Sequence, residues 1–261
     1  MTPIEIADLA ERLQYARNNN LIIDPLSEPC APESMEDAVK IALAAMPTRP
    51  VAWKLGGTNQ ATRDIFGVEV PYFGPLRDGV IYNSGEVISR SAFPAPLMAE
   101  PEIAVAFNQS FEPALERRDE SKLAAALDWV APAIEMPATC LKDVSAAGVN
   151  WLVADCCAAG ALVVGQRLAP RALSMLEDAS CYLEINHMRV SGTQYSLIGR
   201  VLGSVADALC QFGRYGLRVE QGAVLATGGL FSAISVQLAE DITGYFREER
   251  GDNVKVTATL A

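Results

Sequence analysis

The hydrophobic pattern of this chain changes at Pro50, and that change constrains the fold more than any other feature. Before Pro50, apolar residues recur at the spacing of amphipathic helices. After it, short apolar runs alternate with turn residues, which is typical of β-strands, and a few longer amphipathic segments interrupt them. The pattern predicts an α+β protein with a helical N-terminal part, residues 1–49, and a β-rich part, residues 50–261. A chain of 261 residues lies near the upper limit for one hydrophobic core, so we expect no division into two equal domains.

Local signals place the individual elements. A capping-box pattern from Thr2 to Glu5 starts a first helix, and a second helix begins after Ser34 and stops before Pro47. Asn186 and the following histidine are expected at the tip of a hairpin, although the glycine of the strongest two-residue turns is missing. The expected strands are 51–55, 80–82, 86–88, 102–107, 133–136, 161–164, 181–185, 188–190, 223–226 and 254–259, and the further expected helices are 121–130, 141–147 and 201–215.

Composition excludes several classes of function. The formal net charge of −11 argues against nucleic acid or an anionic membrane as a partner, and no apolar run is long enough to cross a bilayer. The six cysteines are scattered, which favours reduced thiols in the cytoplasm, and we expect Cys156 to be buried and inert. The single histidine, His187, is expected to face solvent and makes zinc sites and histidine-based triads improbable.

Three glutamates form the pattern with the clearest chemical meaning. Glu100 and Glu102 stand two apart at the start of an apolar strand, so both point to one side of a sheet. Glu135 lies within an apolar segment, where an unpaired charge would be costly. Three carboxylates without histidine or cysteine suit a hard cation, Mg²⁺ or Mn²⁺. The alternative is that Glu100 and Glu102 are exposed and that Glu135 pairs with an arginine.

Six short motifs that include these glutamates occur in a family-specific order. Together they resemble the hydratase/decarboxylase branch of the fumarylacetoacetate hydrolase superfamily, and they spread over most of the chain. The resemblance implies a mixed, largely antiparallel β-roll with a metal at its mouth and a small helical N-terminal part. The motifs are V-A-W-K-L-G-G-T (51–58), F-G-P-L-R-D-G-V (73–80), A-E-P-E-I-A-V-A-F (99–107), L-D-W-V-A-P-A-I-E (127–135), V-A-D (153–155) and V-L-A-T-G-G (224–229).

The resemblance also implies roles for individual residues. Glu100, Glu102 and Glu135 would bind the divalent metal. Lys54 and Asp78 would carry protons, and a cation near a partly desolvated Lys54 would lower its pKa. From the residues alone, Lys54 is more readily explained as a strand residue that reaches solvent, and Asp78 is equally a turn residue before Gly79.

Two further places in the sequence are candidates for substrate binding. Thr227 and Gly228 follow an apolar strand and would offer backbone N–H groups to a substrate carboxylate, although such strings are common turns. Arg200 stands where hydratases of this branch typically carry histidine, and it would bind a second substrate carboxylate or lie on the surface.

These features predict a metal-dependent hydro-lyase that hydrates a 2-hydroxy-2,4-dienoate to a 4-hydroxy-2-oxo acid. A metal ion that stabilises an enolate serves equally for decarboxylation of a 2-oxo dienoic diacid or for hydrolytic cleavage of an acylpyruvate. A third possibility is an inactive paralogue that acts as a structural partner. We expect a homo-oligomer, or a complex with a related hydratase or decarboxylase.

Overall fold

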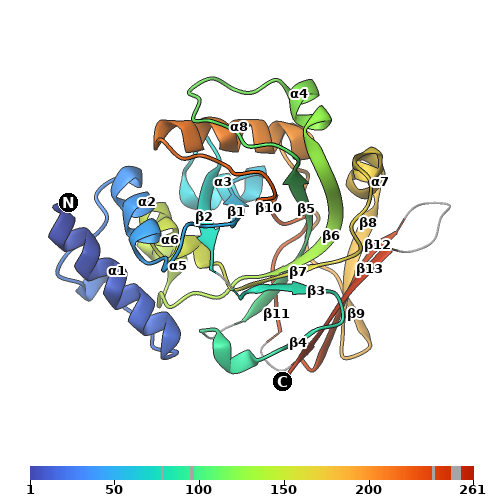
Figure 1. Cartoon of the computed structure of the whole chain (residues 1–261). Helices are drawn as coiled ribbons and strands as arrows, with labels where there is room; N and C mark the ends of the chain where they lie inside the picture. The colour runs from blue at the N-terminus through green and yellow to red at the C-terminus, as the bar shows by residue number, and fades with distance from the viewer. Residues whose placement is uncertain (78, 95–96, 237–238, 248–253) are drawn as a thin grey trace.

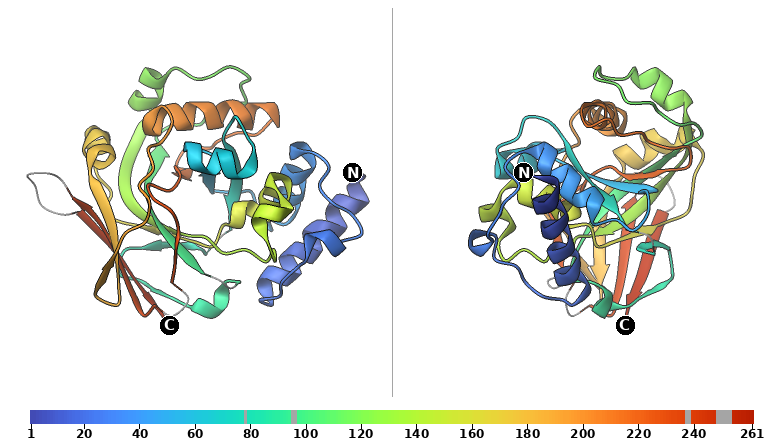
Figure 2. Two further views of the ribbon diagram at one scale, coloured as in Figure 1. Left: turned by 180° about the vertical axis from the view of Figure 1, so that it is seen from behind. Right: turned by 60° about the vertical axis from the view of Figure 1, so that its left-hand side comes forward.

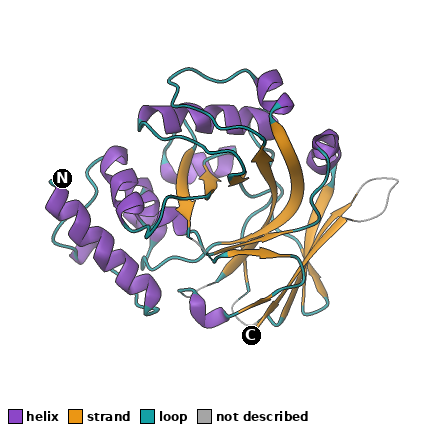
Figure 3. Ribbon diagram, viewed as in Figure 1, coloured by secondary structure: helices purple, strands orange, loops and turns teal. Residues whose placement is uncertain are grey.

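The computed structural model describes residues 1–77, 79–94, 97–236, 239–247 and 254–261, and within them it shows two sheets flanked by helices (Figures 1 and 3). The prediction of an α+β fold is confirmed. None of the helices in the described ranges has both the length and the hydropathy needed to cross a bilayer.

The larger sheet forms the centre of the molecule. Its strand order is β2-β1-β10-β5-β6-β7-β3, with β11 paired to β5. β5 and β6 are long, curved and antiparallel, and they share the most extensive pairing of the sheet (Figure 1). The strands are β1 (Ala52–Gly56), β2 (Tyr72–Leu76), β3 (Ile81–Asn83), β5 (Met98–Phe107), β6 (Leu127–Met136), β7 (Ala161–Val164), β10 (Val224–Ala226) and β11 (Ile234–Ser235).

The smaller sheet packs against β5, β6 and β7 through its own central strands. Its order is β4-β13-β12-β8-β9, and it lies on the side away from the N-terminal helices (Figures 1 and 2). Asn186 and His187 form the tip of the β8–β9 hairpin, with φ of 48° and 64°, as predicted. The strands are β4 (Val87–Ile88), β8 (Ser180–Ile185), β9 (Met188–Val190), β12 (Asp241–Arg247) and β13 (Val254–Leu260).

Helices cover the remaining faces. α1 and α2 pack together at the N-terminal end, and α2 in turn packs on α6. Phe212 of α8 contacts Trp53 of β1 and Phe73 of β2, which fixes α8 on the larger sheet. The helices are α1 (Pro3–Asn18), α2 (Met35–Ala44), α3 (Gln60–Phe66), α4 (Glu120–Ala125), α5 (Val144–Ala147), α6 (Val149–Ala154), α7 (Leu173–Asp178) and α8 (Arg200–Arg214), with short 3₁₀ turns at Pro25–Ser27, Arg90–Ala92, Cys156–Ala158 and Pro170–Ala172.

Element boundaries differ from expectation at one important place. The helix expected over 121–130 ends at Ala125, and β6 begins at Leu127. The helical spacing of the apolar residues is real, but Val130 pairs with Val105 of β5 in the sheet, and this long-range pairing overrides local propensity. The strands β2, β11 and β12 and the helices α3, α6 and α7 were not predicted.

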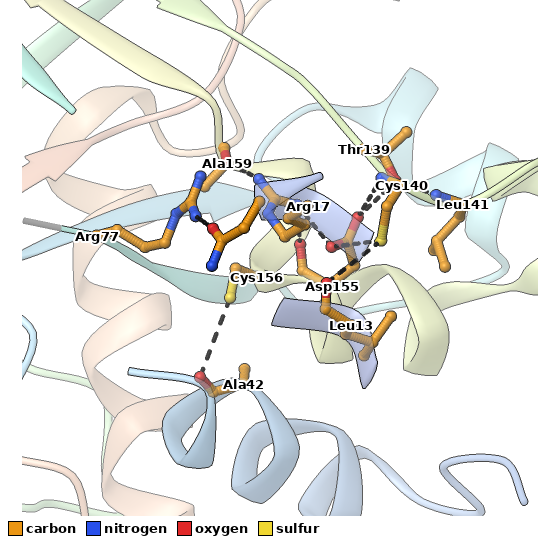
Figure 4. A network of polar contacts seen from close by, with 11 residues as sticks. Leu13, Arg17, Ala42, Arg77, Thr139, Cys140, Leu141, Asp155, Cys156 and Ala159 are labelled. Atoms are coloured by element: carbon orange, nitrogen blue, oxygen red, sulfur yellow. Dashed lines mark hydrogen bonds and ion pairs between the residues drawn. The ribbon is translucent and has the colours of Figure 1, made fainter. Parts of the chain in front are cut away.

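A buried ion pair fastens α1 to the rest of the molecule (Figure 4). Arg17 Nη1 donates to Asp155 Oδ1 over 2.6 Å, and the same guanidinium donates to the backbone oxygens of Asp155 and Ala159. The other oxygen of Asp155 accepts from Thr139 and from the backbone N–H of Cys140. Both charged side chains are almost fully buried, at 3% and 0% exposure. The aspartate of the V-A-D motif therefore has a structural partner 138 residues away.

Arg17→Met should destabilise the protein by about 3–5 kcal/mol, because it leaves the buried Asp155 carboxylate without its counter-charge. Lys40→Met is the matched control, since Lys40 pairs with Glu36 on the exposed face of α2, where solvent screens the pair and its loss should hardly change stability. Urea unfolding of both variants measures the difference. Adding Asp155→Asn to Arg17→Met should recover part of the loss, and equal stability of the two single variants would contradict this account.

Candidate metal centre

The pairing of β5 with β6 brings the three glutamates together. Glu100 lies directly opposite Glu135 in the antiparallel register, and Glu102 lies two residues further along the same face of β5. One carboxylate oxygen from each residue lies within 4.8 Å of the others. The cluster thus depends on strand register, because a slip by one residue would turn Glu135 to the opposite face.

The cluster is buried and incompletely satisfied. Glu102 and Glu135 are fully buried, and the Glu100 side chain is 15% exposed. Glu102 Oε1 and Glu135 Oε1 have no hydrogen-bond partner among the described residues. Buried carboxylate oxygens without partners carry a large desolvation cost, so we expect these two atoms to contact a bound ligand.

Charge and burial shift the pKa values of all three glutamates. Burial raises the pKa of Glu135 to about 8, although Lys54 opposes the shift. Burial and the charges of Glu100 and Glu135 raise the pKa of Glu102 well above its usual range, and burial also raises that of Glu100. The alternative of exposed glutamates is excluded for Glu102, and Glu135 pairs with a lysine rather than an arginine.

Lys54 enters the cluster from β1. Its Nζ lies 2.8 Å from Glu135 Oε2 and 3.9 Å from Glu100 Oε1, and the side chain is 9% exposed. Burial alone would lower the pKa of Lys54, but the charges of Glu135, Glu100 and Glu102 outweigh it and raise the pKa above the ordinary value. This direction is opposite to the one expected from sequence, because that expectation included a neighbouring cation whose charge offsets the carboxylates.

The T-G-G segment after β10 contacts the glutamate cluster through a backbone hydrogen bond. The backbone N–H of Gly228 donates to Glu102 Oε2 over 2.9 Å, and Thr227 Oγ1 donates to the backbone oxygen of Ile103. Gly228 has φ of 108°, and a Cβ there would lie 1.9 Å from Thr58 Oγ1, so only glycine fits. Gly228 and Thr227 therefore hold β5 and its carboxylate, and Gly228 also lines the cavity described below, so a role of these two residues toward a substrate stays a prediction.

A cavity of about 310 Å³ opens beside the cluster, and Lys54, Glu100, Gly228 and Gly229 are among the residues that line it. Its other walls come from α3, β2, β5, α6 and the segment that follows β6. The sequence reasoning missed Tyr72 as part of this wall. The signal was the Gly56-Gly57 pair, because a Cβ at Gly56 would collide with the Tyr72 ring.

The remaining predicted residues lie elsewhere or outside the described residues. The guanidinium of Arg200 is exposed, pairs with Glu177 and Asp178, and is not among the residues that line the cavity. Asp78 falls outside the described residues. Cys156 is buried, and burial raises the pKa of its thiol to about 11, which agrees with an inert thiol. All six cysteines are free.

The residues present fit a divalent cation. Glu100, Glu102 and Glu135 supply oxygen donors only, which is the donor set of hard cations. A doubly charged ion would also pair the two buried oxygens that lack a partner and would reduce the repulsion among three like charges.

A curled mixed sheet with a carboxylate cluster beside a cavity is the combination that the ordered motifs of the sequence predict. No protein-family model matches the chain. A 2-hydroxyhexa-2,4-dienoate hydratase of Comamonas testosteroni is 28% identical over 231 residues, covering 84% of this chain and 85% of the relative. A 4-oxalocrotonate decarboxylase of Pseudomonas putida is 28% identical over 195 residues, covering 74% of this chain and 72% of the relative.

A solved structure confirms the fold. The 4-oxalocrotonate decarboxylase from Pseudomonas putida G7, complexed with magnesium and adipate, matches with a TM-score of 0.82 at 22% identity, covering 100% of this chain and 99% of that one. The resemblance to the hydratase/decarboxylase branch of the superfamily, expected from the ordered motifs, is thereby confirmed.

Glu135→Gln should abolish stabilisation by metal. At a Mg²⁺ concentration of about a hundred times the dissociation constant, the wild type should gain about 2.7 kcal/mol of stability, seen as a rise in Tm. The variant should show no rise, because it loses one charged donor at the centre of the cluster. Glu36→Gln, on the exposed face of α2, is the control and should respond like the wild type. A full metal response in Glu135→Gln would contradict the assignment of this site.

Proposed function

We propose that this protein is a metal-dependent hydro-lyase that hydrates a 2-hydroxy-2,4-dienoate to a 4-hydroxy-2-oxo acid. The observation that carries the proposal is the position of Lys54, which lines the cavity and whose Nζ lies 2.8 Å from Glu135 Oε2 and 3.9 Å from Glu100 Oε1. A proton carrier thus stands beside three metal ligands and open space for a small acid. The 28% identical hydratase relative supports the same reaction class.

Each part of the site has a distinct task in this reaction. When bound, the cation would supply positive charge to the substrate's carboxylate and 2-oxygen and so favour the enolate form. Lys54 and Asp78 would move the proton that the 2-hydroxyl loses to carbon 5, which converts the dienol to a 2-oxo-3-enoate. Water then adds across the remaining double bond, with its hydroxyl on carbon 4 and its proton on carbon 3. Gly228 keeps Glu102 fixed throughout by its backbone hydrogen bond.

The identity of the ion, the cellular location and the oligomeric state are part of the same proposal. Carboxylate-only ligation favours Mg²⁺ or Mn²⁺. We further propose a cytoplasmic location, which agrees with six free thiols, and a homo-oligomer or a complex with a related hydratase or decarboxylase.

Decarboxylation of a 2-oxo dienoic diacid is the second candidate, and the decarboxylase relative supports it. That reaction needs a cationic partner for the second carboxylate of the substrate. Arg200, the residue considered for this role, already pairs with Glu177 Oε2 at 3.0 Å and Asp178 Oδ1 at 2.7 Å. Its guanidinium is 56% exposed and lies outside the cavity lining, so hydration is favoured.

The reaction class can be identified by following ultraviolet absorbance. Purified protein with Mg²⁺ or Mn²⁺ is mixed with 2-hydroxypenta-2,4-dienoate, 4-oxalocrotonate or an acylpyruvate, and products are identified by mass. We expect metal-dependent loss of the dienoate chromophore with a gain of one water. Carbon dioxide release or pyruvate formation would assign the decarboxylase or the hydrolase reaction in its place. Lack of turnover with all three would favour an inactive structural paralogue.

Lys54→Met should reduce turnover by roughly 10²–10⁴-fold, the usual contribution of a positioned acid or base. The Mg²⁺-induced rise in Tm should persist or increase, because Glu135 loses the ammonium group that competes with the ion. Lys122→Met, on the exposed part of α4, serves as the control for removing a lysine. If Lys54→Met kept wild-type turnover, Lys54 would have no role in proton transfer.

A further inference from the structure

We infer that a second cavity, between α2 and α8, is a binding site for a small aromatic carboxylate. Among the described residues that line it, none belongs to the glutamate cluster, so the inference does not depend on the proposed function. Both helices pack on β2, which also lines the cavity. Its volume is about 140 Å³. An engineered cavity of roughly 150 Å³ holds one benzene molecule, so a single six-membered ring fits a space of this size.

The walls that come from α2, from β2 and from the segment before β2 are apolar or aromatic. Met35 and Val39 stand four residues apart on α2, so they lie on one face of that helix. Phe73 of β2 adds an aromatic ring, whose centroid lies 6.0 Å from that of Tyr215 on α8. Aromatic ligands pack against such rings in edge-to-face or offset arrangements.

The wall that comes from α8 is polar and lacks partners within the protein. Gln211 is only 6% exposed, yet its side-chain amide forms no hydrogen bond within the described residues. Arg214 lines the same cavity three residues later, so both side chains lie on one face of α8. Its guanidinium has no ion-pair partner in the part of the chain that the structure describes. A buried amide without a partner is costly, so we expect Gln211 to contact a bound ligand.

These two groups select the charge of the ligand. The amide N–H of Gln211 and the guanidinium of Arg214 are both donors, and a carboxylate can accept from both. Burial raises the pKa of Tyr215, Arg214 lowers it and Glu36 raises it, so one positive and one negative charge lie near that hydroxyl. Glu36 is paired with Lys40 at 2.7 Å, which offsets its repulsion of an anion.

The ring of Tyr72 separates this cavity from the one beside the glutamate cluster, because Tyr72 lines both. A small aromatic acid that bound in either cavity would therefore lie near the same ring. Substitutions on the two sides of Tyr72 are needed to locate it.

Fluorine NMR with 4-fluorobenzoate as the probe tests the site in the full-length protein, in buffer without divalent ions. We expect saturable binding with a dissociation constant on the order of 1 mM. The amide 4-fluorobenzamide has the same shape without the charge, and it should bind roughly fivefold or more weakly. Fluoroacetate, which has the carboxylate without the ring, should not bind measurably.

Two substitutions on α8 remove the proposed partners of the carboxylate. Arg214→Met and Gln211→Met should each weaken binding of 4-fluorobenzoate by roughly tenfold, since methionine has a similar length but donates no hydrogen bond. Arg171→Met, which removes an exposed arginine outside the cavity, is the matched control and should bind like the wild type. Arg214 is itself exposed, so its variant tests the site even if Gln211→Met does not fold.

A variant on the other side of Tyr72 locates the probe. Val144 lines the cavity beside the glutamate cluster, and Val144→Trp should narrow that cavity without changing binding of 4-fluorobenzoate. Binding that is lost in Val144→Trp but kept in Arg214→Met would place the probe beside the cluster and overturn the inference. Absence of saturable binding up to about 10 mM, or equal affinity of the wild type and both α8 variants, would also overturn it. None of these outcomes bears on the proposed function.

Discussion

The constraint on which this structure depends is charge balance inside the sheet. Glu102 and Glu135 are fully buried and Glu100 is nearly so, while Lys54 brings one positive charge to the three negative ones. Such a cluster opposes folding unless the acids are partly protonated or a further positive charge joins them. The raised pKa of Glu135 favours partial protonation. A divalent cation would supply the further positive charge. The cluster is therefore explained by function, because stability alone would favour apolar residues at these positions.

Backbone geometry positions each member of the cluster. The β5–β6 register places Glu100 opposite Glu135, and β10 lies between β5 and β1, so that Lys54 reaches across from the next strand but one. The chain then leaves β10 through Gly228, whose positive φ aims its N–H at Glu102. Four segments far apart in the sequence thus converge on one point. That convergence places the groups proposed for proton transfer and metal binding on strands or directly after them, where they would need little reorganisation during a reaction.

The sequence predicted that the three glutamates lie close together, because the signals for that are local or chemical. A two-residue spacing puts Glu100 and Glu102 on one face, and an acid within an apolar strand marks Glu135 as a residue with a partner. What could not be predicted depends on long-range geometry. Arg17 and Asp155 form an ion pair although they are 138 residues apart in the sequence. The first residues of β6 have the apolar spacing of a helix but pair in the sheet. Arg200 fails to reach the cavity because Glu177 and Asp178, close by in the fold, bind its guanidinium.

The Arg17–Asp155 pair also links the N-terminal helices to the cavity. Cys156, Cys157 and Ala158 all have φ between 53° and 57°, a left-handed conformation that costs about 1–2 kcal/mol per residue outside glycine. Arg17 donates to the backbone oxygens of Asp155 and Ala159, which flank this turn on both sides. Cys157 and Ala158 line the cavity, so the shape of its apolar wall depends on a hydrogen bond donor from α1. The helical N-terminal part therefore contributes to the cavity wall, because Arg17 of α1 binds the backbone on both sides of the turn that carries Cys157 and Ala158.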